Sequence, residues 1–237
     1  MTVVTQVLIY GGLAGLAIPL GALLSRYERI RSPWVESEVR HGVTAFGAGA
    51  LLAAIALVLV PDGIEKLALA PLTAVFFAGG CLFAFLDWYL ARKGTTLGQF
   101  VAMLADFVPE CLALGALFIH YPAGARLLAV LIAMQNVPEA FNSYREFLAN
   151  GNKPPTRALL LFALLAPVGP LAAYLGLSFF AESPELISMI MVFAAGGILY
   201  LMFQDIAPKV SLEKSWLPPM GALLGFYVGI VGAIVVG

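Results

Sequence analysis

The feature that most constrains this chain is a series of apolar runs, each close to the length that crosses a lipid bilayer. Eight such runs can be marked in the 237 residues, and one crossing needs roughly 20 mostly apolar residues. Backbone groups in lipid must be hydrogen-bonded within the protein, and the runs exceed barrel strands, so we expect helices. The runs are 4–24, 42–60, 72–91, 99–120, 126–147, 157–180, 187–207 and 216–236. The sequence predicts an all-α integral membrane protein of eight transmembrane helices, forming a single domain over residues 1–237.

The composition excludes several other classes of protein. A mean hydropathy of +0.95, with 61% hydrophobic and 11% charged residues, rules out an ordinary soluble domain. The net charge of −1 predicts no nucleic-acid partner. Cys81 and Cys111 both lie in apolar runs, so we expect neither a disulfide framework nor a zinc knuckle. Because no basic run precedes the first apolar segment, we do not expect a cleaved signal peptide.

Lysine and arginine are distributed unequally between the two sides of the predicted bundle. One side holds eleven of them, and the other holds only Lys66 and Arg126. Positive charge marks the cytoplasmic side, so both termini are expected outside the cytoplasm, and the short loops favour a bacterial inner membrane. A miscounted segment would scramble this bias, which therefore also supports eight crossings. The eleven are Arg26, Arg29, Arg31, Arg40, Arg92, Lys93, Arg145, Lys153, Arg157, Lys209 and Lys214.

The second and seventh apolar segments share a pattern. Residues 46–49 read Phe-Gly-Ala-Gly and residues 193–196 read Phe-Ala-Ala-Gly, and a proline, Pro61 or Pro208, follows fifteen residues after each phenylalanine. The two segments are five crossings apart, an odd number, so they run in opposite directions. This predicts an inverted repeat of helices 1–3 and 6–8 around central helices 4 and 5. The alternative is that small residues recur in any membrane helix.

A polar phrase occurs twice, once in each central helix. Residues 106–110 read Asp-Phe-Val-Pro-Glu, and residues 135–139 read Gln-Asn-Val-Pro-Glu. In each phrase the first polar residue and the glutamate stand four apart, which puts both on one face of a helix. Charged side chains at membrane depth are costly and usually face a partner or a water-filled path.

These phrases supply hard oxygen ligands. Asp106, Glu110 and Glu139 offer carboxylates and Gln135 offers an amide carbonyl, a set suited to a divalent cation. The alternative is a structural hydrogen-bond network of buried acids. A fixed salt bridge is poorly supplied, because no Lys or Arg stands near mid-membrane in any predicted segment.

The proline in each phrase adds to this chemistry. Pro109 and Pro138 lack an amide hydrogen, so the carbonyls of Ala105 and Met134 lose their helical partners. We expect a kink at each proline and a freed carbonyl that can bind metal or water.

The doubled phrase resembles the ZIP (Zrt/Irt-like) metal transporters. In that family helix four carries His-Asn-x-Pro-Glu-Gly and helix five a related phrase. Residues 14–17 and 21–24 also look like the family's first helix, and residues 193–196 and 204–208 look like its seventh. The resemblance covers the whole chain in segment count, orientation and order.

The resemblance implies metal binding between helices four and five. It assigns the family's first-site ligands to Asp106, Glu110, Gln135 and Glu139, with Asp106 in place of the usual imidazole. All four positions still carry groups that bind metal.

The family's second site is largely missing. Its helix-four asparagine falls on Phe107, its helix-five acid on Asn136, and its helix-six glutamate on Gly169. Only Asn136 and Glu139, which can bridge two sites, remain. The chain therefore looks like a one-site member.

The resemblance implies a transporter, not an enzyme, that moves a divalent cation toward the cytoplasm by alternating access. Without imidazole the site is harder, so manganese, iron(II) or even magnesium competes better, while zinc still accepts carboxylates. The transported metal and the lipid bilayer are the expected partners, and no cofactor is expected. A homodimer is compatible with the sequence but is not specified by it.

Two other functions are weaker interpretations. The missing second site is compatible with a transport-dead metal sensor or partner subunit. An intramembrane metal-dependent enzyme acting on lipid phosphates lacks a cluster of Arg or His at the interface.

Two further groups are candidates on the predicted cytoplasmic side. Gln204 and Asp205 either line an exit path or cap a solvated helix end. Glu36, Glu38 and His41 are grouped near the second helix, but spacing alone is weak evidence for a metal site.

Overall fold

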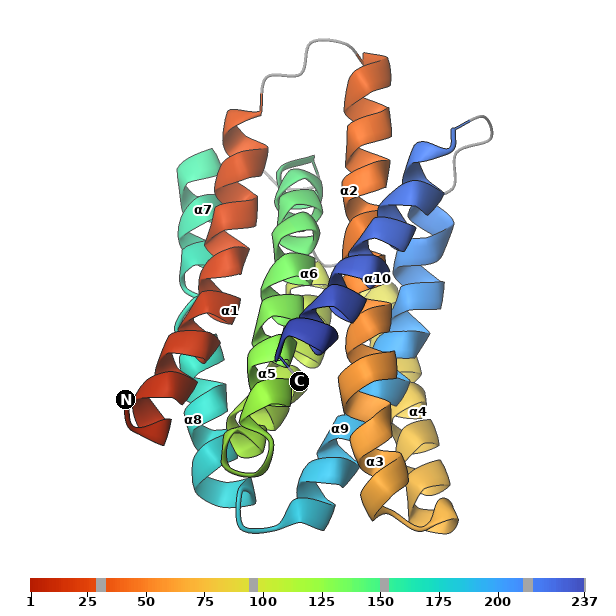
Figure 1. Cartoon of the computed structure of the whole chain (residues 1–237). Helices are drawn as coiled ribbons and strands as arrows, with labels where there is room; N and C mark the ends of the chain where they lie inside the picture. Colours follow the sequence, from red (N-terminus) through yellow and green to blue (C-terminus); the bar gives the residue numbers. More distant parts are fainter. Residues whose placement is uncertain (29–32, 94–97, 150–153, 211–214, 237) are drawn as a thin grey trace.

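The protein is a helical bundle, as a computed structural model of the whole chain shows (Figure 1). The structure describes residues 1–28, 33–93, 98–149, 154–210 and 215–236, and within them no strand is found. Arg29, Arg31, Lys153 and Lys214, which the orientation prediction uses, lie outside these residues, as do the side chains of Glu36, Lys93 and Lys209.

Each apolar segment expected from the sequence contains helix. Several helices begin at a proline, among them those starting at Pro122 and Pro184, because proline is favoured in a first turn whose N–H groups have no helical acceptor. The elements are α1 (Val3–Tyr27), α2 (Pro33–Ala54), η1 (Ile55–Leu59), α3 (Val60–Lys66), α4 (Leu69–Lys93), α5 (Gly98–His120), α6 (Pro122–Ala149), α7 (Pro155–Ala163), α8 (Val168–Phe180), α9 (Pro184–Leu201), η2 (Met202–Ile206), η3 (Ala207–Val210) and α10 (Leu217–Val236).

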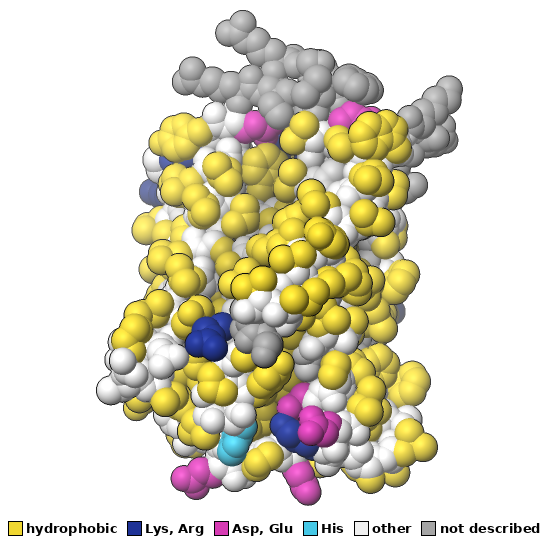
Figure 2. Space-filling view, in the orientation of Figure 1, with side chains coloured by type: hydrophobic (Ala, Val, Ile, Leu, Met, Phe, Trp, Pro, Cys, Tyr) yellow, Lys and Arg dark blue, Asp and Glu magenta, His cyan; other side chains and the backbone are white. Residues whose placement is uncertain are grey.

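The prediction of an all-α membrane protein is confirmed. Seven helical spans within the described residues are long and apolar enough to cross a membrane. The eighth predicted span, α6, is not among them because polar side chains interrupt it, although it is 28 residues long. Eight crossings therefore stay a prediction. Hydrophobic side chains, yellow in Figure 2, are spread over the visible face of the bundle between its two ends.

The helices associate in two groups. α1, α5, α6, α7 and α8 pack mainly on one another, and α2, α3, α4, α9 and α10 form the second group. The two groups meet mostly where α6 lies along α2 and where α5 lies along α9 (Figure 1). The polar phrases of α5 and α6 thus lie in helices at the boundary between the groups.

Helices α2 and α9 are each followed by a π-helical turn. The turn η1 begins nine residues after Phe46, and η2 begins nine residues after Phe193. Pro61 and Pro208 each stand two residues beyond their turn. The shared pattern seen in the sequence thus extends to an unusual local backbone, at the same register in both segments.

Candidate functional site

Glu110 of α5 and Gln135 of α6 are in direct contact. The Gln135 Nε2 atom donates to both carboxylate oxygens of Glu110, over 2.9 Å to Oε1 and 2.7 Å to Oε2. Both side chains are buried, at 0% and 1% exposure. Burial of a carboxylate is costly unless hydrogen bonds compensate it, so the two bonds from Gln135 stabilise the buried Glu110 side chain.

The opposite end of the Gln135 amide is unsatisfied. Its Oε1 atom is buried and has no hydrogen-bond partner within the described residues. Buried polar atoms are rarely left in this state, and the exceptions often mark a place for an ion or water.

Asp106 and Glu139 lie near this contact. Asp106 is buried one turn before Glu110, and its Oδ1 atom accepts a hydrogen bond from the backbone N–H of Phe107 over 2.8 Å. Glu139 is half-buried, one turn after Gln135. Glu110 and Glu139 are both close enough to Asp106 to interact electrostatically. Three of the four predicted ligands are therefore acids around one buried amide.

Asn136 has a different partner. Its Nδ2 atom donates to the carbonyl of Ala14 in α1 over 3.3 Å, and the side chain is 1% exposed. Asn136 therefore ties α6 to α1 in this structure.

The four ligands do not form a closed cage here. Within the residues that the structure describes, no three His, Cys, Asp or Glu side chains are grouped closely enough to hold a metal ion. The helices continue through Pro109 and Pro138, and the kinks and freed carbonyls stay predictions. The four-oxygen site likewise stays a prediction.

A cavity of about 480 Å³ leads to Gln135 from one end of the bundle. Its wall includes Gln135 and Glu139 from α6 and Asp205 from η2, whereas Glu110 lies behind Gln135 and does not line it. The remaining lining residues are Arg40, His41, Thr44, Gly47, Ala48, Leu51, Pro138, Asn142, Ser143, Arg145, Glu146 and Ile206.

Of the two predicted exit-path residues, one lines this cavity. Asp205 is half-buried and close enough to Glu139 to interact electrostatically. Gln204 is exposed and is not part of the cavity wall. Both belong to the π-helical turn η2, and such turns are frequent at functional sites.

Most residues of the cavity wall could not be identified from the candidate motifs of the sequence. Asn142, Ser143 and Glu146 follow Glu139 by three, four and seven residues, which places all four on one face of α6. That spacing is a signal that could have identified them. The cavity-lining residues of α2 have no such signal in the sequence, because their position depends on how α2 packs on α6.

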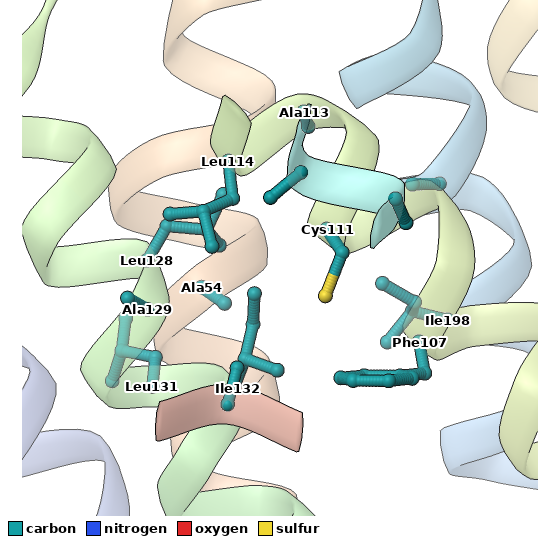
Figure 3. Close-up of a cluster of buried hydrophobic side chains, with 14 of the residues drawn as sticks. Ala54, Phe107, Cys111, Ala113, Leu114, Leu128, Ala129, Leu131, Ile132 and Ile198 are labelled. Atoms are coloured by element: carbon teal, nitrogen blue, oxygen red, sulfur yellow. The ribbon is translucent and has the colours of Figure 1, made fainter. Parts of the chain in front are cut away.

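Apolar side chains fill the region where the ZIP resemblance would place further ligands. Phe107 is fully buried, and Figure 3 shows its ring and the Cys111 sulfur pointing into the apolar space beside Ile132. A Cβ atom added at Gly169 would lie 2.3 Å from the Gly11 carbonyl and 3.1 Å from the Phe107 ring. A glutamate at position 169 would therefore not fit this packing.

The chain is similar to curated zinc transporters. It is 36% identical over 154 residues to zinc transporter ZIP9-A from Xenopus laevis, covering 60% of this chain and 48% of that protein. Zinc transporter ZIP9 from Xenopus tropicalis is 35% identical, and ZIP9-B from Xenopus laevis 34%, over the same shares. No family model matches the chain.

The chain spans about half the length of the curated relatives it matches. The relatives are from Xenopus, so they give no support to a bacterial inner membrane. Three ZIP proteins align with more than half of this chain at 34–36% identity, and the resemblance to the ZIP family predicted from the sequence is confirmed.

Proposed function

We propose that the protein carries a divalent metal cation across the membrane toward the cytoplasm, through a site formed by Asp106, Glu110, Gln135 and Glu139. The relatives are named as zinc transporters, which supports zinc as a substrate. The carboxylate-rich ligand set extends the candidates to manganese and iron(II). The observation that carries the proposal is the buried contact between Glu110 and Gln135 at the closed end of a cavity.

The metal replaces the amide nitrogen of Gln135 in this mechanism. The Nε2 atom now lies between both oxygens of Glu110, where a cation is chelated by a carboxylate. A half-turn of the amide exchanges Nε2 for Oε1, so that a donor becomes an acceptor and Gln135 becomes a ligand. In the same step the unpartnered Oε1 atom gains the cation as a partner, and the Nε2 atom gives up its two bonds to Glu110.

Release follows the cavity. Glu139 lines the cavity and is one turn from Gln135, so it is the ligand through which a cation leaves the buried site. Asp205 then offers the next carboxylate along the wall. The lysine and arginine bias, which includes Arg40 and Arg145 of the cavity wall, supports a cytoplasmic opening for this cavity.

The two helix groups supply the moving parts. The metal ligands all belong to α5 and α6, in one group, whereas Asp205 belongs to the other. Alternating access then consists of one group shifting against the other, which exposes the site to one side at a time.

The packing of glycines supports the inverted repeat as part of this proposal. A Cβ atom added to any of four glycines would lie 2.0 Å from a backbone carbonyl of a neighbouring helix. Two of these contacts join α2 to α10, and two join α4 to α9. The second pair of contacts repeats the first pair at equivalent positions. The contacts are Gly49 with Ala222, Gly225 with Phe46, Gly196 with Phe76 and Gly79 with Phe193.

Flux in proteoliposomes tests the function. We expect the purified chain to carry zinc into vesicles and Glu110→Gln to reduce the flux to background, since the amide removes the chelating charge. Glu185→Gln makes the same chemical change at the start of α9 and is expected to keep full flux. Equal flux in Glu110→Gln and the unmodified protein would refute the assigned site.

A further inference from the structure

His41 lies on the cavity wall at the opposite end of the proposed pathway from Glu110. It belongs to α2 and lines the same cavity as Gln135, Glu139 and Asp205. A cation that leaves the buried site toward the cytoplasm would pass this wall, so the chemistry of His41 bears on the last part of the path.

One ring nitrogen of His41 is already fixed. Its Nδ1 atom lies 2.5 Å from the backbone carbonyl of Ser37, one turn earlier in α2. A carbonyl only accepts, so Nδ1 carries the proton. In the neutral imidazole this leaves the lone pair on Nε2, which makes no hydrogen bond within the described residues. Metal-binding histidines have this same arrangement, with the second ring nitrogen donating to a carbonyl or carboxylate.

The other titratable groups of the wall are of both signs. Glu139, Glu146 and Asp205 contribute carboxylates, while Arg40 and Arg145 contribute guanidinium groups. Arg145 donates to Glu28 of α1 over 2.6 Å, so part of its charge is compensated by that carboxylate. Three carboxylates thus face two guanidinium groups on the wall, and one of these two is already paired with a carboxylate outside the cavity. The net charge of the wall therefore favours a divalent cation.

From this arrangement, we propose that His41 is the ligand of a second, weaker metal site. A zinc-like cation binds there transiently between the buried site and the cytoplasm. The inference rests on the proposed function for its direction, but the binding itself does not. His41 is the one imidazole on this cavity wall, and no group of three His, Cys, Asp or Glu side chains is found among the described residues, so the cation keeps water ligands and leaves readily. An imidazole favours zinc over magnesium, so this second site selects among the ions that the hard buried site admits.

Carbethoxylation by diethyl pyrocarbonate tests the site without requiring transport. The chain has two histidines, His41 and His120, and the reagent modifies neutral imidazole. His120 is the exposed last residue of α5, and its Nε2 atom is 2.6 Å from the Ala181 carbonyl at the end of α8. We expect zinc to slow modification of His41 several-fold and magnesium to leave it unchanged, with His120 as the internal reference. Equal modification of His41 with and without zinc would overturn the proposal.

The variant Glu110→Gln separates this site from the buried one. In Glu110→Gln, zinc must still protect His41, because the proposed ligand is separate from Glu110. Loss of protection there would mean that the reagent reports occupancy of the buried site, and the inference would fail.

Flux gives the second readout. His41→Gln is expected to lower zinc flux several-fold while manganese flux changes little, and His120→Gln is expected to change neither. Protection of His41 without any flux would leave the site intact and refute the proposed function instead. Equal losses of zinc and manganese flux in His41→Gln would refute selection at this position.

Discussion

The Gln135 amide nitrogen bridges the two carboxylate oxygens of Glu110, and this single group joins helices α5 and α6 at the closed end of the cavity. The amide provides hydrogen bonds to the buried Glu110 carboxylate, so this carboxylate needs no bound cation or basic side chain in the metal-free protein. The same bridge must open for metal to bind.

Gln135→Glu converts the bridge into a pair of facing acids. The donor is lost and a second carboxylate meets Glu110, so unfolding is expected to become easier by roughly 1–3 kcal/mol without metal. Added zinc or manganese is expected to restore the unfolding temperature, because a divalent cation is bound by both acids. Thermal unfolding in detergent with and without metal measures this. Gln6→Glu, at the start of α1, is the control and should show no metal-dependent recovery.

Asp106→His introduces the imidazole that the ZIP resemblance leads one to expect at this position. Nitrogen ligands favour zinc over manganese, so the ratio of zinc to manganese flux is expected to rise. Competition between the two ions in proteoliposomes measures the ratio. Asp87→His makes the same change near the end of α4, where Asp87 accepts a hydrogen bond from Tyr200, and should leave the ratio unchanged. An unaltered ratio in Asp106→His would argue against Asp106 as a ligand.

Gly15→Ala tests the close packing of α1 on the turn that joins α7 to α8. A Cβ atom at Gly15 would lie 2.1 Å from the Ala166 carbonyl, a backbone atom that cannot move aside alone. We expect a loss of about 1–3 kcal/mol in stability, seen as a lower unfolding temperature. Gly12→Ala is the matched control, since a Cβ atom there meets nothing within 4 Å. Similar unfolding temperatures for the two variants would contradict this packing.

Thr44→Val removes a contact between the two helix groups. Asn142 Nδ2 in α6 donates to Thr44 Oγ1 in α2 over 2.6 Å, and both residues line the cavity. One such bond is worth about 1 kcal/mol, so its loss is expected to shift the population several-fold away from the form with this cavity. The alkylation rate of Ser143→Cys, in a Cys81→Ala background, reports the cavity and is expected to fall. Thr5→Val, near the N-terminus of α1, provides the control.

The helices and the polar phrases could be predicted because both depend on local sequence. Apolar length identifies a membrane helix, and a four-residue spacing identifies one face. The role of each polar group could not be predicted in the same way. The sequence indicated the Gln135 oxygen as a ligand, whereas the structure has its nitrogen on Glu110, because an isolated buried carboxylate requires a donor.

The cavity was harder still to predict. Asp205 reaches it from a π-helical turn, and His41 and Thr44 reach it from α2. No periodicity in the sequence marks a π-helical turn, and contact between distant helices leaves no local pattern. The loss of a second site stays a prediction, and the close approach of position 169 to the Gly11 carbonyl and the buried Phe107 ring could be seen only in the structure.

The π-helical turns change which neighbour each helix touches. Helix α2 packs on α10, whereas η1 and α3 after it pack on α9; helix α9 packs on α4, whereas η2 and η3 after it pack on α2. An inserted residue rotates the rest of a helix by about 100°, which is enough to redirect its contact face. The end of the α2 segment therefore packs on α9, and the end of the α9 segment packs on α2. Deleting one residue from either π-helical turn would rotate the residues after it and remove one of these two contacts.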